Sequence, residues 1–306
     1  MPSLRQLEYL VAVAETLHFR RAAERTNTTQ PTLSEQLKAL EDRLGVQLIE
    51  RSRSRIVMTP VGIQVVEIGR RMLRDASEIR TIAVNGGKEL AGLLRLGLPP
   101  TIGPYLLPHV LPTLHARYPE LRLHIRESPP NLLPGALEDG KIDIAITMLP
   151  VQHLELESEF LFREPLLLAV GADHRLADRG MIDKSELGGE DVLTLGPGHQ
   201  LHDAVLSLCN EFGARLRPEF EGTSLDTLRE MVVMGLGITF LPGLYVRREI
   251  LRDPSIRMLE IKGRSIYRTV GLSWRKSSGQ RASYVKLASF FRSEIEREFK
   301  EFPITG

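Results

Sequence analysis

The sequence predicts an α/β protein in which an N-terminal winged helix-turn-helix is joined by a long helix to a two-lobed α/β domain. Three observations lead to this prediction. Residues 19–55 contain two short helical stretches around a polar break, followed by two short strand-like stretches. Residues 59–84 carry apolar side chains at helical spacing, and from Leu93 onward strand-like segments alternate with helical ones.

The first helix is expected over residues 4–16. The apolar side chains on one of its faces are Leu7, Leu10, Val11 and Ala14. Their i, i+3, i+4, i+7 spacing is typical of a helix that packs on its neighbours. Ser3 directly precedes the helix and is a good N-cap, because its hydroxyl can accept a backbone N–H of the first turn.

The helix-turn-helix follows. A short helix over residues 20–25 is succeeded by a polar break and by a second helix that opens at Thr29 and runs to Leu44. The Thr29 hydroxyl can cap this second helix, and Pro31 lies in its first turn, where a missing N–H costs little. The apolar stripe of the second helix is Leu33, Leu37, Leu40 and Leu44.

The opposite face of the second helix carries small and polar side chains near its N-terminus. A helix that enters the DNA major groove needs such groups to reach base edges. The residues expected to face the groove are Thr29, Gln30, Pro31, Thr32, Ser34, Glu35 and Lys38. Glu35 can accept a hydrogen bond from cytosine N4, but its carboxylate would repel a phosphate.

Two short strands at residues 46–49 and 56–58 predict a wing after this helix. The arginines that alternate between the strands are Arg51, Arg53 and Arg55. Such a tip suits contact with phosphates or with the minor groove. The alternative is a hairpin tip that is simply solvated.

A long amphipathic helix is expected next, over residues 59–84. Val65, Met72 and Ile79 repeat every seven residues along it. A helix of this length cannot bury such a stripe alone, so the spacing favours pairing with a second copy of the helix. The alternative is a helix that packs on its own domain, and the polar break at residues 85–87 argues against it.

Charge is distributed unevenly along the chain. Residues 1–88 contain 14 Lys and Arg against 10 Asp and Glu, a net charge of +4. The remaining residues contain 26 against 29, a net charge of −3. A nucleic-acid contact is therefore expected in the N-terminal part, where the basic charge coincides with the helix-turn-helix.

The stretches HFRRAAER, TQPTLSEQLKALEDRLGVQLIER and TPVG, within residues 4–62, resemble the N-terminal domain of LysR-type transcriptional regulators. The family pattern usually has Val-Ser where this chain has Thr28-Thr29, and threonine keeps the capping chemistry. The resemblance implies a homodimer or homotetramer that binds a roughly palindromic double-stranded DNA site, with RNA polymerase as a further candidate partner. It assigns residues 1–60 to the winged helix-turn-helix and residues 61–88 to a linker helix that pairs two subunits.

The C-terminal part alternates strands and helices. The expected strands are residues 93–98, 121–127, 142–148, 165–170, 192–195, 237–242 and 267–273. The expected helices are residues 105–118, 132–139, 202–213, 224–234 and 281–299. The alternation of strands and helices breaks near residues 148–162. The chain is expected to cross into a second lobe there and to return to the first lobe near Gly263.

Two α/β lobes joined by two crossovers resemble the periplasmic-binding-protein-like effector domain of the LysR family, which is expected here over residues 89–306. Lobe I would consist of residues 89–162 and 265–306, and lobe II of residues 163–264. Ligands of such layers bind at the carboxyl ends of strands. A cleft between the lobes is therefore expected to hold a small-molecule effector.

Four loops at strand ends or helix starts would meet at this cleft. Their polar side chains and free backbone N–H groups can hold a polar or anionic effector. The candidate effector-binding residues are Thr101, Ser128, Asn131, His199, Gln200, Asp203 and Ser224. Taken singly, each loop is as well explained by a cap or turn that satisfies its own backbone.

The stretches LPPTIGPYLLPHVLPTLHARYPELRL, FEGTSLDTLREMVVMGLGITFLP and VGLSWR further resemble the OxyR-type, peroxide-sensing branch of the family. In that branch a reactive cysteine follows the loop histidine, and a second cysteine lies nine residues on. Here the first position is Gln200 and the second is Cys209. Pro130 also stands where the branch often has a threonine.

The disulfide switch of that branch is not carried over to this chain. A glutamine forms neither a sulfenic acid nor a disulfide, and one cysteine cannot close an intrachain bridge. Cys209 is expected to be buried beside Val205, Leu206 and Leu208, because free cysteines are among the most buried residues. The alternative is a peroxide-responsive regulator that works by oxidation of Cys209 alone.

Other function classes find no support in the sequence. No run of about 18 apolar residues and no signal peptide is present, so a cytoplasmic protein without membrane contact is expected. His199, His202 and Asp203 lie close together, but no further ligand cluster accompanies them, and neither a metal nor a cofactor is expected. Walker, nucleophile-elbow and Gly-x-Gly-x-x-Gly motifs are missing, so an enzyme is not expected.

Overall fold

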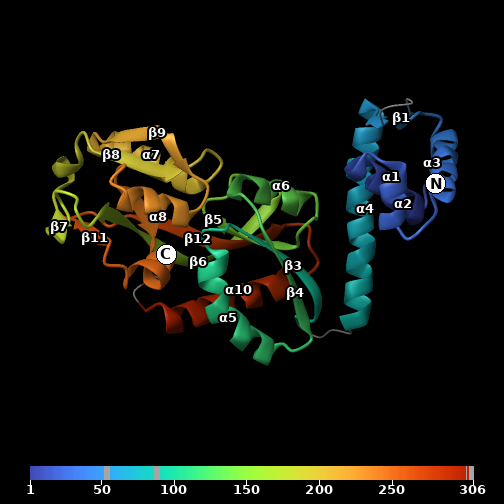
Figure 1. Ribbon diagram of the computed structural model, residues 1–306. Helices are drawn as coiled ribbons and strands as arrows, with labels where there is room; N and C mark the ends of the chain where they lie inside the picture. Colours follow the sequence, from blue (N-terminus) through green and yellow to red (C-terminus); the bar gives the residue numbers. More distant parts are fainter. Residues whose placement is uncertain (52–55, 86–89, 301, 303–306) are drawn as a thin grey trace. The chain divides into compact units, whose positions relative to one another are not determined.

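The computed structural model describes residues 1–51, 56–85, 90–300 and 302. The chain forms two compact units, Met1–Lys88 and Glu89–Gly306 (Figure 1). Each unit has its own buried apolar core.

The N-terminal unit contains helices and a short hairpin. Its elements are α1 (Leu4–Thr16), α2 (Phe19–Arg25), α3 (Gln30–Leu44), β1 (Ile49–Arg51), β2 (Ile56–Met58) and α4 (Pro60–Asn85). Ser3 caps α1 as predicted, since its hydroxyl accepts the Gln6 N–H at 3.2 Å. Thr29 caps α3 in the same way, accepting the Thr32 N–H at 3.4 Å. Gly45 ends α3 in the left-handed conformation.

Leucines of α1 and α3 form the core of this unit. Leu10, Leu33 and Leu40 are fully buried, and Leu37 is nearly so. Leu44, the last residue of the predicted stripe, is instead 37% exposed, because α3 ends there. The buried stripe fixes α3 with its polar face away from the core.

The wing begins later than the sequence predicts. A first strand is predicted at residues 46–49, whereas β1 starts at Ile49 and pairs antiparallel with β2. The Glu41 carboxylate explains the difference, because it accepts the N–H groups of Leu48 and Ile49 at 2.8 and 3.0 Å. The chain up to Leu48 is thereby held at the end of α3. Two of the predicted wing residues lie outside the described part of the chain, Arg53 and Arg55.

Helix α4 presents two apolar faces. One face packs on α1: Val66 is 3% exposed, and a β-carbon on Gly69 would lie 3.4 Å from the Leu7 side chain. The other face carries Met72 and Ile79 of the predicted seven-residue repeat, together with Ile68, and is largely exposed in a single chain. Its exposed fractions are 48% for Ile68, 43% for Met72 and 68% for Ile79. Packing on its own unit therefore takes up Val65, the first residue of the predicted repeat, and leaves Met72 and Ile79 exposed.

The C-terminal unit is built on two sheets. The larger has eight strands in the order β4-β3-β5-β12-β6-β11-β7, with β10 paired to β6, and the smaller pairs β8 with β9 in parallel. The strands are β3 (Gly92–Leu98), β4 (Leu121–Glu127), β5 (Ile144–Met148), β6 (Leu156–Gly171), β7 (Met181–Ile182), β8 (Asp191–Leu195), β9 (Arg215–Gly222), β10 (Thr239–Pro242), β11 (Ile256–Ile261) and β12 (Tyr267–Arg275).

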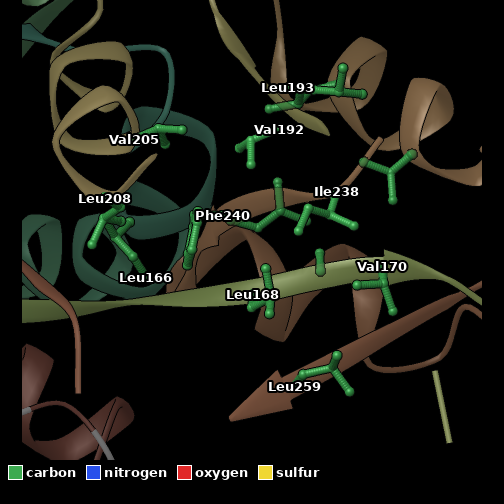
Figure 2. Close-up of a cluster of buried hydrophobic side chains, with 14 of the residues drawn as sticks. Leu166, Leu168, Val170, Val192, Leu193, Val205, Leu208, Ile238, Phe240 and Leu259 are labelled. Carbon is green, nitrogen blue, oxygen red and sulfur yellow. The ribbon is translucent and has the colours of Figure 1, made fainter. Parts of the chain in front are cut away.

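Helices cover these sheets and close two large cores. They are α5 (Gly103–Arg117), η1 (Pro130–Leu132), α6 (Leu133–Glu138), η2 (Lys184–Leu187), α7 (Gln200–Phe212), α8 (Leu225–Val233), α9 (Gly243–Tyr245), η3 (Val246–Ile250) and α10 (Arg281–Glu298). The first core gathers Phe162, Trp274 and Phe291 between the sheet and helices α5 and α10. The second joins strands β6, β8 and β10 to α7 and includes Leu168 and Phe240 (Figure 2). A smaller cluster lies under α6.

Strand β6 passes through both parts of this unit. The sequence predicts a strand only at residues 165–170, but β6 begins at Leu156 and pairs with β12 up to Pro165. In the sequence, this first half lacks the apolar pattern of a strand because it contains charged side chains. Glu157 and Glu159 occupy it and form ion pairs with arginines of α10. After Pro165 the strand pairs with β10 and β11, so it forms one of the two crossovers.

The sequence does not predict β7, β9, β11, η1, η2, α9 and η3. Strand β9 reads RLRPEFEG, in which charges and Pro218 obscure the strand pattern, and half of its residues are exposed. Strand β11 has buried residues separated by exposed ones, a pattern that local spacing in the sequence can indicate. Helix α9 is only three residues long, too short to leave a period in the sequence.

Candidate functional site

The predicted recognition face lies on the exposed side of α3. Ser34 is half-buried. The other predicted residues on this helix and its cap are exposed: Thr29, Gln30, Pro31, Thr32, Glu35 and Lys38. The Thr29 and Thr32 hydroxyls also bond to each other at 2.8 Å, which fixes both at the helix start. A polar helix end is thus presented to solvent, as reading base edges requires.

The hydroxyl and carbonyl oxygens of Thr101, in the loop after β3, are both hydrogen-bonded within the protein. Thr101 is 6% exposed. Its hydroxyl accepts from Arg268 Nη1 at 3.1 Å, and its carbonyl accepts from Arg268 Nη2 at 3.1 Å. The sequence suggests this hydroxyl as a direct ligand group, but in the structure it is turned toward β12.

The loop after β4 lies at the end of β3, where the Ser128 N–H donates to the Leu98 carbonyl at 3.0 Å. Ser128 is half-buried and Asn131 is exposed. A β-carbon on Gly198 would lie 3.2 Å from Asn131 Nδ2, and Gly198 has a φ of +95° that favours glycine. The structure therefore brings Asn131 against the loop that leads into α7.

Three predicted residues lie at the start of α7. Gln200 is its first residue and Asp203 lies in its first turn, and both are exposed. His199 precedes the helix without capping it through its side chain. Burial lowers the pKa of His199, and its Nδ1 is buried without a hydrogen-bond partner among the described residues. A neutral imidazole therefore flanks the loop beside Asn131.

Ser224 caps α8, which agrees with the alternative that each loop satisfies its own backbone. Its hydroxyl accepts the Thr227 N–H at 3.1 Å. Ser224 is exposed. Asp226, in the first turn of α8, accepts a hydrogen bond from the Tyr245 hydroxyl at 2.9 Å.

A buried ion pair lies beside Thr101. Glu164 on β6 is fully buried, and Arg268 on β12 is 9% exposed. Arg268 Nε donates to Glu164 Oε2 at 2.6 Å, while Glu164 Oε1 accepts the Leu244 N–H at 2.9 Å. The only sequence signal for this pair is a carboxylate next to the apolar run of β6 and an arginine within the apolar run of β12.

The segment α9–η3 contacts the start of α5. The Tyr245 ring meets the Tyr105 ring edge-on, with centroids 5.3 Å apart. Arg248 Nη1 donates to the Pro104 carbonyl at 2.7 Å. Burial raises the pKa of Tyr105 to about 12 and raises that of Tyr245 as well, so both rings carry neutral hydroxyls near pH 7.

Cys209 lies on the buried face of α7. It is 2% exposed and packs in the apolar core with Val205 and Leu208. The prediction that Leu206 also lies on this buried face is wrong, since Leu206 is 40% exposed. Burial raises the pKa of the Cys209 thiol to about 11, so the neutral thiol dominates near pH 7.

Two other features bear on the site. A cavity of about 230 Å³ lies along β6 and β11 and is lined by none of the predicted effector residues. In the part of the chain that the structure describes, no group of three or more His, Cys, Asp and Glu side chains could hold a metal ion. The polar loops around Asn131 and Gln200 remain the candidate site.

Comparison with protein families decides the class of protein. Residues 4–63 match the bacterial regulatory helix-turn-helix model of the lysR family. Residues 87–296 match the LysR substrate binding domain. The chain is a LysR-type transcriptional regulator. It is therefore a DNA-binding protein that regulates transcription, with a helix-turn-helix domain followed by a two-lobed α/β domain.

This LysR-type regulator is similar to OxyR proteins over nearly its whole length. It is 41% identical over 297 residues to the DNA-binding transcriptional dual regulator OxyR of Escherichia coli K12, with 97% of both chains covered. It is 38% identical to the hydrogen peroxide-inducible genes activator of Haemophilus influenzae, with 96% of this chain and 97% of the relative covered.

Solved structures show the same likeness. A full-length OxyR variant from Pseudomonas aeruginosa matches with a TM-score of 0.76 and 37% identity, covering 95% of this chain and 98% of that one. A variant of Corynebacterium glutamicum OxyR with bound hydrogen peroxide matches with a TM-score of 0.67 and 33% identity, covering 97% and 94%. Within the described residues, the LysR-type chain contains no helix able to span a membrane.

Proposed function

We propose that this regulator reads a palindromic double-stranded DNA site with α3 and adjusts its binding to a small polar effector held between its two C-terminal lobes. One observation carries the effector part of the proposal. Loops from opposite sides of the predicted cleft meet where Asn131 lies against Gly198, next to the exposed Gln200. A group bound there would contact both lobes at once.

The DNA contact is proposed for the exposed face of α3 and for the wing. Thr29, Gln30, Pro31, Thr32 and Ser34 lie at the helix start, where base edges are read. Glu35 and Lys38 follow about one turn later. The charge of Lys38 suits a phosphate, and the wing residues Arg51, Arg53 and Arg55 are proposed to neutralise further phosphates.

Replacing Lys38 by alanine is expected to weaken DNA binding and to flatten its salt dependence. If Lys38 neutralises one phosphate, the slope of log K against log salt becomes shallower by about 0.9. Fluorescence anisotropy at several salt concentrations measures both quantities. Lys141→Ala is the matched control, since its ammonium pairs with Asp139 at 2.6 Å in the C-terminal unit. Equal slopes for the two variants would contradict the placement of α3.

The exposed face of α4 supports a dimer. Ile68, Met72 and Ile79 form an apolar stripe that a single chain leaves in water. Pairing two such helices buries the stripe and presents two recognition helices to two half-sites. We propose a homodimer on this basis, with a homotetramer as a dimer of dimers and RNA polymerase as the partner that turns DNA binding into transcription.

The effector proposal commits to a polar ligand. Asn131 and Gln200 can hydrogen-bond a hydroxyl, amide or carboxylate, and the first-turn N–H groups of α7 favour an anionic group. Asp203 lies in the same turn and favours a donor instead. Ser128 and His199 flank the contact, whereas Thr101 and Ser224 are proposed to shape its walls, because their hydroxyls are bonded internally.

A screen of small polar compounds by thermal shift tests this proposal. A ligand at about 100 times its Kd is expected to stabilise the protein by about 2.7 kcal/mol. Asn131→Ala should reduce the shift, because it removes the lobe I contact, while Lys141→Ala should leave it unchanged. A screen in which no compound depends on Asn131 would argue against this site.

A second candidate is a peroxide-responsive regulator that works through Cys209. The similarity to OxyR and to hydrogen peroxide-inducible activators favours it. In that reaction the Cys209 sulfur attacks peroxide, gains an S–OH group and releases water. Burial of the thiol and its raised pKa oppose the reaction. A regulator that responds to a ligand, without catalysis or a cofactor, therefore remains the first proposal.

A further inference from the structure

We infer that contacts behind the cleft, buried except where Tyr245 meets the exposed Asp226, form a positioning relay, which ties the lobe I wall of the proposed effector site to its lobe II wall. The relay, called the hinge clasp below, consists of Thr101, Arg268, Glu164, Leu244, Tyr245 and Asp226. The inference rests on the proposed effector function only for its purpose. Its contacts are all made by residues of this chain.

The clasp begins at the loop after β3. Ile102 and Gly103 both donate backbone N–H groups to the Pro99 carbonyl at 3.0 Å, which makes this loop a tight turn. Arg268 binds both the hydroxyl and the carbonyl oxygen of Thr101. A planar guanidinium that makes two such bonds fixes the orientation of the loop as well as its distance.

The middle of the clasp lies on the crossover strand β6 and on the start of β12, which follows the second predicted crossover. Glu164 and Arg268 are directly opposite each other in the β6–β12 ladder, one pair before its last, Pro165 with Tyr267. Beyond that point β6 pairs with other strands. The ion pair is buried, so water does not compete with it, and any movement of one crossover must carry the other or break the pair.

The far end of the clasp reaches the opposite wall. The second oxygen of Glu164 accepts the Leu244 N–H at 2.9 Å. The next residue, Tyr245, donates its hydroxyl to Asp226 at 2.9 Å. Asp226 lies in the first turn of α8, the helix that Ser224 caps. A chain of direct contacts therefore runs from one candidate wall of the cleft to the other.

This arrangement has a consequence for an effector response. A ligand that shifts the Thr101 loop can either move the crossovers and α9 with it or separate a buried ion pair. Separating the pair is the costly route, because it leaves two charges away from water. The loop, the crossovers and the start of α8 are therefore expected to move as one element between two arrangements.

Hydrogen exchange of backbone amides tests the clasp on the full chain. Thr101→Val removes one hydroxyl and keeps the shape of the side chain. It should speed exchange of the Leu244 amide by about fivefold, the factor for one ordinary hydrogen bond, although Thr101 does not touch Leu244. In an Arg268→Lys background the same change should have no further effect, because lysine keeps the charge but cannot hold both Thr101 oxygens.

Thr147→Val is the matched control, since Thr147 is also buried and its hydroxyl bonds to Ser273 outside the clasp. It should leave the Leu244 amide unchanged. The clasp is overturned if Thr101→Val alters only Ile102 and Gly103, or if exchange accelerates uniformly through β5 and β12. The measurement needs no ligand, so its failure leaves the effector screen untouched, and failure of that screen leaves the clasp standing.

Discussion

Replacing Arg268 by alanine is expected to destabilise the C-terminal unit by about 3–5 kcal/mol, because it leaves the buried carboxylate of Glu164 without its cation. The guanidinium makes three hydrogen bonds, one to Glu164 and two to Thr101. Glu164 has no exposed surface through which water could replace them. An ion pair at the surface offers no comparable effect.

Thermal and denaturant unfolding measure this loss, which corresponds to a Tm lower by roughly 6–20 °C for a unit of this size. Arg281→Ala is the matched control, because the side chain of Arg281 is 58% exposed where it pairs with Glu157. It should cost at most about 1 kcal/mol. Removing both charges with Glu164→Leu and Arg268→Met should recover much of the loss. Equal costs for Arg268→Ala and Arg281→Ala would contradict the account of the pair.

Placing an aspartate on the exposed stripe of α4, by Met72→Asp, is expected to weaken binding to a two-half-site DNA by about 100-fold or more. The substitution puts a charge into the proposed helix pair, and a monomer loses the gain that comes from holding two sites at once. Binding to a single half-site should change far less, because α3 is untouched.

Analytical ultracentrifugation and DNA titrations together check this prediction. Gln64→Asp is the control: it adds the same charge at another exposed position of α4, outside the seven-residue repeat. It should leave both the dimer and the affinity for paired half-sites nearly unchanged. A stable Met72→Asp dimer with full affinity would mean that the subunits associate through another surface.

Local signals in the sequence were sufficient for the N-terminal unit. Ser3 and Thr29 act as caps because their chemistry depends on neighbours within one helical turn. The buried leucines of α3 follow from spacing alone. The start of β1 does not follow from spacing, because the Glu41 carboxylate, seven positions earlier, binds the backbone N–H of Leu48.

Contacts between distant parts of the chain could not be predicted from local patterns in the sequence. The first half of β6 is a strand because β12 pairs with it, and charged side chains conceal its pattern. Glu164 and Arg268 are 104 positions apart, so no local spacing indicates their pairing. Thr101 was proposed as a ligand group from its loop, but its hydroxyl binds Arg268 instead. The loops that form the candidate site can thus be predicted from the sequence. The hydrogen bonds within the site cannot.

The central claim is that this LysR-type regulator responds to a ligand in its cleft and not through its thiol. Peroxide titration of the reduced protein tests it most directly, with Cys209 followed by mass spectrometry and operator affinity measured on the same samples. We expect that Cys209 gains no oxygen while the protein stays folded and that the affinity stays constant. A gain of one oxygen atom at Cys209 that tracks a change in affinity, and that Cys209→Ala abolishes, would contradict it.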